Sequence, residues 1–260
     1  MAYALITGAS GGIGLCLARE LAQRKIDLLL VARSGDRLSK ICDDLKQEFK
    51  IQVEYLSLDL SGPNAVNSLM DWIREKSFSV NILINNAGYG IWGTVESTSS
   101  EKLNNMMQLN MNVVANLSHA MLPELKKHEK SYILNVASTA AYQAVPTLAT
   151  YAASKAFVVL FTRGLRMELK GTSVSVTCLS PGATSTNFID RAGMDAMKER
   201  AEKFSMKPEA VAKIAIEGMF KGEAEILPGF INWLSVQMTY LMPKFIPEKI
   251  AAGLYKTENK

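Results

Sequence analysis

Short apolar runs with strand character alternate with longer amphipathic stretches along most of the chain. The runs occupy residues 3–7, 27–32, 52–57, 81–85, 132–137 and 174–179. Such alternation is typical of βαβ units, in which crossover helices join parallel strands. Residues 28–31 are all apolar, which suits strands that helices cover on both faces. The sequence therefore predicts an α/β fold with a doubly wound parallel sheet.

The chain of 260 residues contains no Pro/Gly/Ser-rich linker between these runs and no repeat of fixed period. We therefore predict a single domain over residues 1–260. The pattern changes after the sixth run. Residues 183–207 form a long connection with scattered Met and Phe side chains, and we predict a lid over the substrate there. A helix at 208–220 and a short strand at 225–227 are expected to follow.

The segment 229–257 is predicted to be an apolar helical tail. Its residues 230–245 are mostly apolar, but Asn232, Gln237 and Pro243 interrupt them. A membrane span needs about 20 apolar residues, so a transmembrane helix is not expected. Three roles stay open for the tail: an extension of the substrate wall, the cover of a subunit interface, and a contact with a membrane surface.

The composition excludes several classes of protein. The 29 basic and 25 acidic residues give a net charge of +4 and form no basic stripe, so no nucleic-acid partner is expected. Cys16, Cys42 and Cys178 form no CxxC pair, and His119 and His128 have no cysteine near them, so we expect no metal site. Unpaired cysteines and the lack of a secretory signal favour the cytoplasm, with the membrane periphery as the open alternative.

A glycine-rich turn follows the first run. Gly8, Gly12 and Gly14 lie in the motif TGASGGIG, and a helical pattern begins at once. Glycines let backbone N–H groups approach a pyrophosphate, and a helix N-terminus adds partial positive charge. Ser10 adds a hydroxyl donor and Ile13 lies in the same turn, so we predict that these five residues bind a dinucleotide. The alternative is a turn whose glycines serve only close helix–sheet packing.

The end of the second run predicts the type of dinucleotide. An acidic residue there binds the ribose 2′-hydroxyl of NAD, whereas an Arg nearby accommodates the 2′-phosphate of NADP. Ala32 stands where the acid is expected, and Arg33 follows it. A guanidinium group suits a phosphate. The sequence therefore favours NADPH or NADP over NADH, unless Arg33 is merely a surface residue.

A second group of residues predicts chemistry. Tyr151 and Lys155 are four apart at the start of a strongly helical segment, so they share a helix face. An adjacent ammonium group favours the phenolate form of a tyrosine, whose pKa is ordinarily near 10. Ser138 follows the fifth run, and the carboxyl ends of parallel strands are where open α/β sheets bind ligands. Ser138 is thus placed to donate a hydrogen bond to a substrate oxygen.

Taken together, these motifs resemble the single-domain branch of the short-chain dehydrogenase/reductase family over residues 2–186. The family pattern TGxxxGxG matches residues 7–14, and its NNAG motif matches residues 85–88. Its serine and its YxxxK motif match Ser138, Tyr151 and Lys155. The resemblance implies a Rossmann-type sheet with a C-terminal helical extension.

The resemblance also implies further contacts with the cofactor. They fall on Asp59, Leu60, Asn86, Ala87, Gly88, Pro181, Gly182, Thr184 and Thr186, and on the catalytic pair Tyr151 and Lys155. Thr184 stands where the family usually has Val or Ile, a mild departure because the contact would run through the backbone.

The family mechanism assigns a role to each residue of the catalytic set. Tyr151 is the general acid in carbonyl reduction, and Ser138 holds the carbonyl oxygen. Lys155 lowers the pKa of Tyr151 and binds the nicotinamide ribose. Asn110 orders a water molecule behind Lys155, with Asn112 as a competitor by spacing.

The resemblance therefore predicts an NADPH-dependent carbonyl reductase or alcohol dehydrogenase. Met and Phe side chains between residues 188 and 206 suit an apolar ligand, so a 3-oxoacyl chain or a steroid-like ketone is the expected substrate class. A homodimer or homotetramer is also implied. Two alternatives stay open: a cofactor-binding regulatory or scaffold protein, and a membrane-peripheral enzyme that reduces a lipid.

Overall fold

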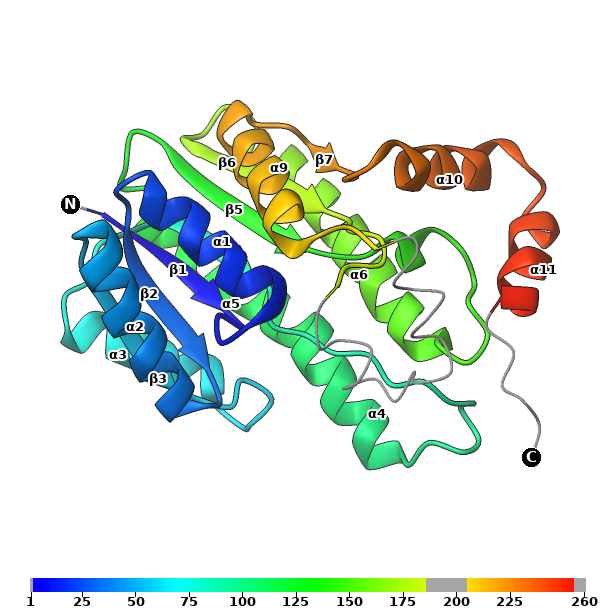
Figure 1. Cartoon of the computed structure of the whole chain (residues 1–260), viewed down its shortest axis with the longest axis horizontal. Helices are drawn as coiled ribbons and strands as arrows, with labels where there is room; N and C mark the ends of the chain where they lie inside the picture. The colour runs from blue at the N-terminus through cyan, green and yellow to red at the C-terminus, as the bar shows by residue number, and fades with distance from the viewer. Residues whose placement is uncertain (1, 186–204, 255–260) are drawn as a thin grey trace.

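The computed structural model describes residues 2–185 and 205–254. Its centre is a sheet of seven strands in the order β3-β2-β1-β4-β5-β6-β7, all parallel (Figure 1). The strands are β1 (Tyr3–Thr7), β2 (Asp27–Ala32), β3 (Val53–Ser57), β4 (Val80–Asn85), β5 (Ser131–Val136), β6 (Val174–Leu179) and β7 (Glu225–Ile226). The strand order reverses between β1 and β4, and ligands bind at such a switch point in open α/β sheets.

Helices cover both faces of this sheet. One face carries α1 (Gly12–Gln23), α2 (Gly35–Phe49) and α9 (Pro208–Lys221). The other face carries α3 (Ala65–Glu75), α5 (Val113–Leu125) and α6 (Ala149–Glu168). Among the described residues, the remaining helical elements are α4 (Ser100–Met107), the π-helical η1 (Gln108–Asn112), the 3₁₀ turn η2 (Thr139–Tyr142), α10 (Phe230–Leu241) and α11 (Phe245–Leu254). The predicted doubly wound α/β fold is confirmed.

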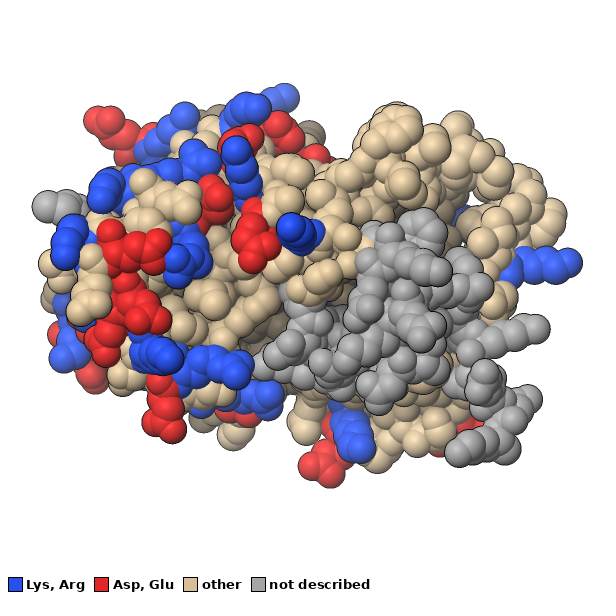
Figure 2. Space-filling view, in the orientation of Figure 1, with Lys and Arg blue, Asp and Glu red and all other residues tan. Residues whose placement is uncertain are grey.

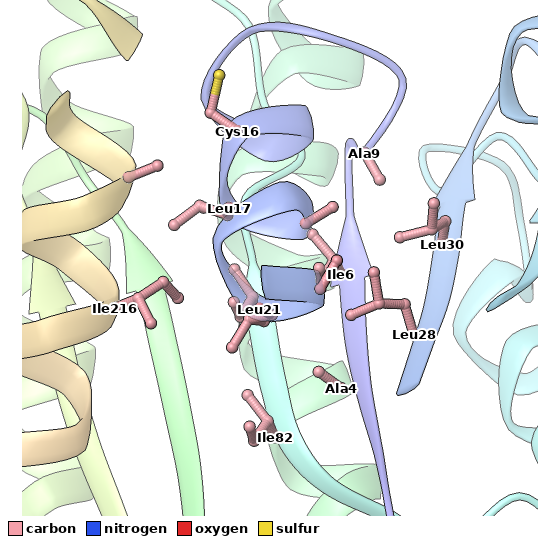
Figure 3. Packing of buried hydrophobic residues seen from close by; sticks show 14 of the residues in the cluster. Ala4, Ile6, Ala9, Cys16, Leu17, Leu21, Leu28, Leu30, Ile82 and Ile216 are labelled. Carbon is pink, nitrogen blue, oxygen red and sulfur yellow. The ribbon is translucent and has the colours of Figure 1, made fainter. Parts of the chain in front are cut away.

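The consecutive apolar residues of the strands supply both halves of the core. Leu5 belongs to the apolar cluster beneath α3, α5 and α6, whereas the next residue, Ile6, belongs to the cluster beneath α1, α2 and α9. Figure 3 shows Leu17 of α1 lying between β1 and Ile216 of α9. Because successive side chains of a strand point to opposite faces, a strand buried on both sides reads as an uninterrupted apolar run.

Strand ends differ from the predicted ones by single residues. The runs 52–57, 81–85, 132–137 and 225–227 appear as Val53–Ser57, Val80–Asn85, Ser131–Val136 and Glu225–Ile226. Ser131 illustrates the reason, since this buried residue donates its hydroxyl proton to the Leu125 carbonyl oxygen at 2.6 Å. The apolar pattern does not include this polar residue in the strand, because its hydrogen-bond partner lies in the preceding helix.

The predicted C-terminal helical extension is present as α10 and α11, which leave the sheet at its β7 edge (Figure 1). Of the predicted lid at 183–207, only 183–185 and 205–207 are described, and an isolated bridge pairs Thr184 with Met206. Residues 186–204 of the lid and 255–257 of the tail lie outside the described residues. Among the described helices, none combines the length and hydrophobicity needed to cross a bilayer.

Candidate active site

The turn between β1 and α1 has the backbone shape that a pyrophosphate site requires. Gly8 and Gly12 adopt φ angles of 68° and 56°, a region that favours glycine. At Gly14 a Cβ atom would lie 2.4 Å from the Gly8 carbonyl oxygen. Within the described residues, no side chain caps the N-terminus of α1, so its first N–H groups are available to an anion. Together with half-buried Ser10 and Ile13, these residues fit the phosphates of a dinucleotide.

Two side chains hold this turn against β4. Thr7 Oγ1 accepts hydrogen bonds from the N–H groups of Asn86 and Ala87, each at 3.0 Å. The Asn86 amide donates to the carbonyl oxygens of Thr7 and Gly8 at 2.9 and 3.2 Å. It lies where a Cβ atom on Gly8 or Gly14 would clash. Asn86 is predicted to contact the cofactor, and its side chain braces the glycine-rich turn, so the backbone here is left to face a ligand.

Charged side chains lie at the ends of β2 and β3. Arg33 Nη1 is 3.9 Å from Asp59 Oδ2, and both side chains are exposed. A hydrogen bond from the Ser61 hydroxyl at 2.6 Å, with a smaller contribution from Arg33, holds the pKa of Asp59 below its usual value. The next residue, Leu60, is buried in the apolar cluster under α3 and α5. Leu60 can therefore meet a ligand only through its backbone.

A ladder of buried amides and hydroxyls fixes the ends of β4 and β5. Asn85 Nδ2 donates to Asn135 Oδ1 at 2.8 Å and to Ser118 Oγ at 3.0 Å. Asn135 Nδ2 in turn donates to Thr162 Oγ1 of α6 at 3.0 Å. Asn85 and Asn135 are partners in the strand register. The ladder therefore joins two strand ends to the helix that carries Tyr151 and Lys155.

Lys155 is the buried cation of the site. Its Nζ donates to the Val136 carbonyl oxygen at 2.8 Å, two residues before Ser138. A Cβ atom on Gly88 would lie 3.3 Å from Lys155 Nζ and 3.0 Å from Asn110 Oδ1, so both groups face the same point. Burial lowers the pKa of Lys155 to about 8. The predicted residues Gly88, Asn110 and Lys155, from three separate elements, are brought together.

Asn110 is positioned by a change in helix type. It lies fully buried in η1, and π-helical turns of this kind are frequent at functional sites. Its Nδ2 donates to the Tyr89 carbonyl oxygen and to Ser154 Oγ, both at 3.0 Å. Ser154 Oγ donates to the Tyr151 carbonyl oxygen at 2.7 Å. The competitor Asn112 is exposed and bonds to Gln108, so the structure brings only Asn110 to the site.

Ser138 begins the turn η2. Its Oγ accepts a hydrogen bond from the Ala140 N–H at 3.1 Å. The N–H of the next residue, Thr139, donates to the Pro181 carbonyl oxygen at 3.0 Å. The strand ends of β5 and β6 are thereby tied together. This places the predicted serine beside the predicted cofactor contacts that begin at Pro181.

The segment after β6 packs against α10. A Cβ atom on Gly182 would lie 2.4 Å from Asn232 Oδ1, so only a glycine allows this approach. Thr184 is buried, and its hydroxyl donates to the Gly182 carbonyl oxygen at 3.1 Å. Its side chain is thus used within the segment, which agrees with the expected backbone contact. Thr186, also predicted to contact the cofactor, lies outside the described residues.

Tyr151 lies in an apolar cluster that the sequence patterns did not predict. Its buried companions are Met106, Val145, Leu148 and Ala152, and the partly buried Tyr89, Ile91, Trp92, Leu103 and Ala140 pack against them. The residues come from the loop after β4, from α4 and from the loop before α6. No single periodic pattern connects them, because they are spread over irregular segments and two helices. They give the site an apolar wall beside the tyrosine.

A polar network that sequence analysis also missed connects η2 to the outer helices. Glu225 of β7 accepts hydrogen bonds from the Tyr142 hydroxyl and from Arg163 Nη2, the latter at 2.7 Å. Burial, with the Glu225 carboxylate, raises the pKa of Tyr142. The Tyr142 hydroxyl also lies 2.8 Å from Ser180 Oγ. This network fixes the far end of the turn that starts at Ser138.

Comparison with known proteins identifies the class to which this fold and site belong. Residues 2–196 match the family model described as short chain dehydrogenase. Sulfoacetaldehyde reductase 2 of Chromohalobacter salexigens is 34% identical over 201 residues, which are 74% of this chain and 79% of that protein. The very-long-chain 3-oxoacyl-CoA reductase of Mus musculus is 27% identical over 263 residues, 98% of this chain and 80% of that protein.

A solved structure agrees with the model over nearly its whole length. The short-chain dehydrogenase from Sphingobium yanoikuyae, in complex with NADPH, has a TM-score of 0.82 and 29% sequence identity, with 93% of this chain and 94% of that chain covered. The chain belongs to the short-chain dehydrogenase/reductase family. It is a nicotinamide-dependent oxidoreductase that acts on CH–OH groups.

Proposed function

We propose that the protein reduces a hydrophobic ketone to a secondary alcohol with NADPH. The observation that carries this proposal is the meeting of the buried Lys155 ammonium group and the Asn110 carboxamide at Gly88, one helical turn from Tyr151. A buried charge is costly unless it has partners. A lysine held in this position is best explained by a reaction that needs its charge.

Ser138, Tyr151 and Lys155 each have a step in this reaction. The bound nicotinamide supplies the hydride. Tyr151 donates its phenolic proton to the substrate oxygen as negative charge develops there. Lys155 stabilises the resulting phenolate by its positive charge. Ser138 Oγ already accepts a hydrogen bond from Ala140, which leaves its own O–H to donate to the substrate oxygen.

Arg33 supports the preference for NADPH over NADH. Its guanidinium group is exposed at the end of β2, beside Asp59. Arg37 Nη1 lies 3.9 Å from the place of a Cβ atom on Gly11, so a second guanidinium group flanks the phosphate turn. Two such groups favour a ligand that carries an additional phosphate.

We expect Arg33→Ala to raise the KM for NADPH by about 10-fold, which corresponds to about 1.4 kcal/mol, and to leave the KM for NADH within about twofold. The reason is that only NADPH carries the 2′-phosphate. Steady-state kinetics with both cofactors checks this. Arg74→Ala is the matched control, because Arg74 pairs with Asp71 on α3 and lies away from the strand ends. An equal loss with both cofactors would contradict the proposed role of Arg33.

The apolar cluster around Tyr151 supports a hydrophobic substrate. Ile91, Trp92 and Leu103 are partly buried there, so a substrate chain lying against them would remove more apolar surface from water. The mouse relative named as a very-long-chain 3-oxoacyl-CoA reductase aligns with 98% of this chain. A 3-oxoacyl chain or a steroid-like ketone is the substrate class that we propose.

The test is NADPH oxidation with 3-oxoacyl thioesters of increasing length, steroid ketones and small diketones. We expect kcat/KM to rise up to about fourfold per added methylene until the cluster is filled, because each buried methylene contributes about 0.8 kcal/mol. Trp92→Ala should flatten this dependence, with Trp72→Ala on α3 as its control. NADPH binding without turnover across the panel would favour a regulatory or scaffold protein instead.

Three predictions of assembly and location stay proposals. We propose a homodimer or homotetramer formed through α6, where Leu160 and Met167 leave large apolar side chains exposed. The single catalytic domain over residues 1–260 and the cytoplasmic location also stay proposals. Analytical ultracentrifugation of wild-type protein and of Leu160→Asp tests the oligomer, which the substitution should dissociate.

A further inference from the structure

The two C-terminal helices expose an unusual number of large apolar side chains. Phe230, Leu241 and Phe245 are 73%, 79% and 67% exposed. We call the whole set the tail face: Phe230, Ile231, Trp233, Leu234, Tyr240, Leu241, Phe245 and Ile250. Single exposed apolar residues are normal on a protein surface, whereas a contiguous set of this kind marks a binding surface.

Helix α10 exposes most of its large apolar residues, whereas two of its polar residues lie toward the body. Asn232 and Thr239 are half-buried, and Asn232 packs against Gly182. The Asn232 amide donates to the Pro228 carbonyl oxygen at 2.7 Å. Only Val236 of this helix is fully buried. Packing against the body therefore does not account for the apolar residues of α10, most of which point outward.

Acidic residues are absent from the chain along most of the tail face. No Asp or Glu occurs between Glu225 and Glu248, and Lys244 lies between them. Lys244 and Lys249 are exposed, whereas Glu248 is half-buried. In Figure 2 the surface over α10 is free of Lys, Arg, Asp and Glu among the described residues, while both signs are mixed over the opposite end of the molecule.

We propose that the tail face docks on the surface of an anionic lipid bilayer. Trp and Tyr side chains are favoured at the boundary between headgroups and acyl chains, and Trp233 and Tyr240 supply both. Aliphatic residues such as Leu241 would enter the acyl region, and Lys244 and Lys249 would attract anionic headgroups. Helices α10 and α11 are too short to cross the bilayer, so the contact is peripheral.

Charge complementarity favours a bilayer over a second copy of this chain. A two-fold interface places the same surface against itself. Lys244 and Lys249 would then face a surface in which Glu248, the acidic residue between them in the chain, is half-buried. Anionic headgroups supply the missing negative charge. Docking does not depend on the proposed reaction, although Asn232 brings α10 next to the segment that starts at Pro181.

The test is co-sedimentation of the full chain with phosphatidylcholine vesicles that contain about 30% phosphatidylglycerol. Near such an anionic surface, each lysine contributes measurably to the free energy of binding. We expect wild-type protein to bind these vesicles and the double variant Phe230→Ser/Leu241→Ser to bind at least about 10-fold more weakly. The control is Val95→Ser/Ile214→Ser, which alters exposed apolar residues outside the tail and should bind like wild type. Lys244→Ala/Lys249→Ala should weaken binding to these anionic vesicles and leave binding to vesicles of pure phosphatidylcholine unchanged.

A second readout follows the tail directly. Trp233 fluorescence should shift to shorter wavelength on addition of vesicles, and Trp233→Phe should abolish the shift, while Trp72 and Trp92 report no change. Thermal unfolding of each variant shows that it is folded. Wild-type protein that stays in the supernatant would overturn the proposal. If the Phe230→Ser/Leu241→Ser variant instead lowers the sedimentation coefficient of the free protein, the tail face is a contact between subunits and the proposal is also overturned.

Discussion

Tyr151→Phe is expected to lower kcat for ketone reduction by about 10³-fold, because proton transfer by a positioned side chain contributes about 10²–10⁴-fold. The substitution removes one oxygen atom and keeps the ring, so the apolar cluster around Tyr151 stays packed. The Kd for NADPH, measured by fluorescence titration, should change by less than about twofold, because a phenyl ring preserves the wall of the site.

The matched control is Tyr142→Phe. Tyr142 is half-buried near the site, and its hydroxyl bonds to Ser180 and Glu225. Its loss leaves the Glu225 carboxylate with one partner fewer, so we expect a lower melting temperature and a kcat within about fivefold of wild type. If Tyr151→Phe retained wild-type turnover, or if Tyr142→Phe lost it instead, the proposed general acid would be wrong.

Lys155→Met is expected to lower kcat by a similar factor of about 10³ without lowering the free energy of unfolding at pH 7. Burial lowers the pKa of Lys155 to about 8, whereas an unfolded lysine has a pKa of about 10.4. Below pH 8 the folded state must bury a charged ammonium group, a penalty of about 3 kcal/mol at 1.36 kcal/mol per unit of pKa. Methionine removes that penalty, and the Val136 carbonyl oxygen left without its donor offsets part of the gain.

The pH dependence of the free energy of unfolding gives a second check on the role of Lys155. Between about pH 8 and pH 10.4 the unfolded chain holds a proton that folded Lys155 has released, so the contribution of Lys155 to the free energy of unfolding rises with pH in that window. Denaturant unfolding of the cofactor-free protein at pH 7 and pH 9.5 should therefore show a rise in wild type that is smaller in Lys155→Met. A variant that is less stable than wild type by several kcal/mol at pH 7 would show that Lys155 has a structural role.

Local patterns predicted most of the fold because each strand is short, apolar and bounded by an amphipathic helix. The β2 run at 27–32 has its predicted bounds, since burial on both faces leaves no polar alternation to misread. Ser131 was missed at the start of β5, since its hydrogen bond to Leu125 depends on how the preceding helix ends. The local sequence does not indicate such a hydrogen-bond partner.

The candidate site was predictable where a motif is local and not where distant segments meet. Gly8, Gly12 and Gly14 are readable from spacing, since backbone conformation and close approach require glycine there. The bracing role of Asn86 is not readable, because the amide reaches across from β4. The apolar cluster around Tyr151 joins irregular segments before α4 and before α6, and no periodicity connects them.

The tail illustrates a different limit. Its composition predicts an apolar helical tail, and the structure has two helices there, α10 and α11. Composition alone left three roles open, because it does not say which side of a helix faces the body. The structure shows that Asn232 and Thr239 are half-buried, whereas Phe230 and Leu241 are exposed. This orientation of α10, together with Lys244 and Lys249, favours a lipid surface.

The most direct test of the central proposal is transfer of deuterium from NADPH dideuterated at C4 of the nicotinamide to a ketone of the panel, followed by mass spectrometry of the alcohol. We expect wild-type protein to yield an alcohol with one deuterium on the former carbonyl carbon, and Tyr151→Phe to yield about 10³-fold less of it. An alcohol without deuterium, or NADPH binding with no alcohol from any ketone, would contradict the assignment of this site to carbonyl reduction.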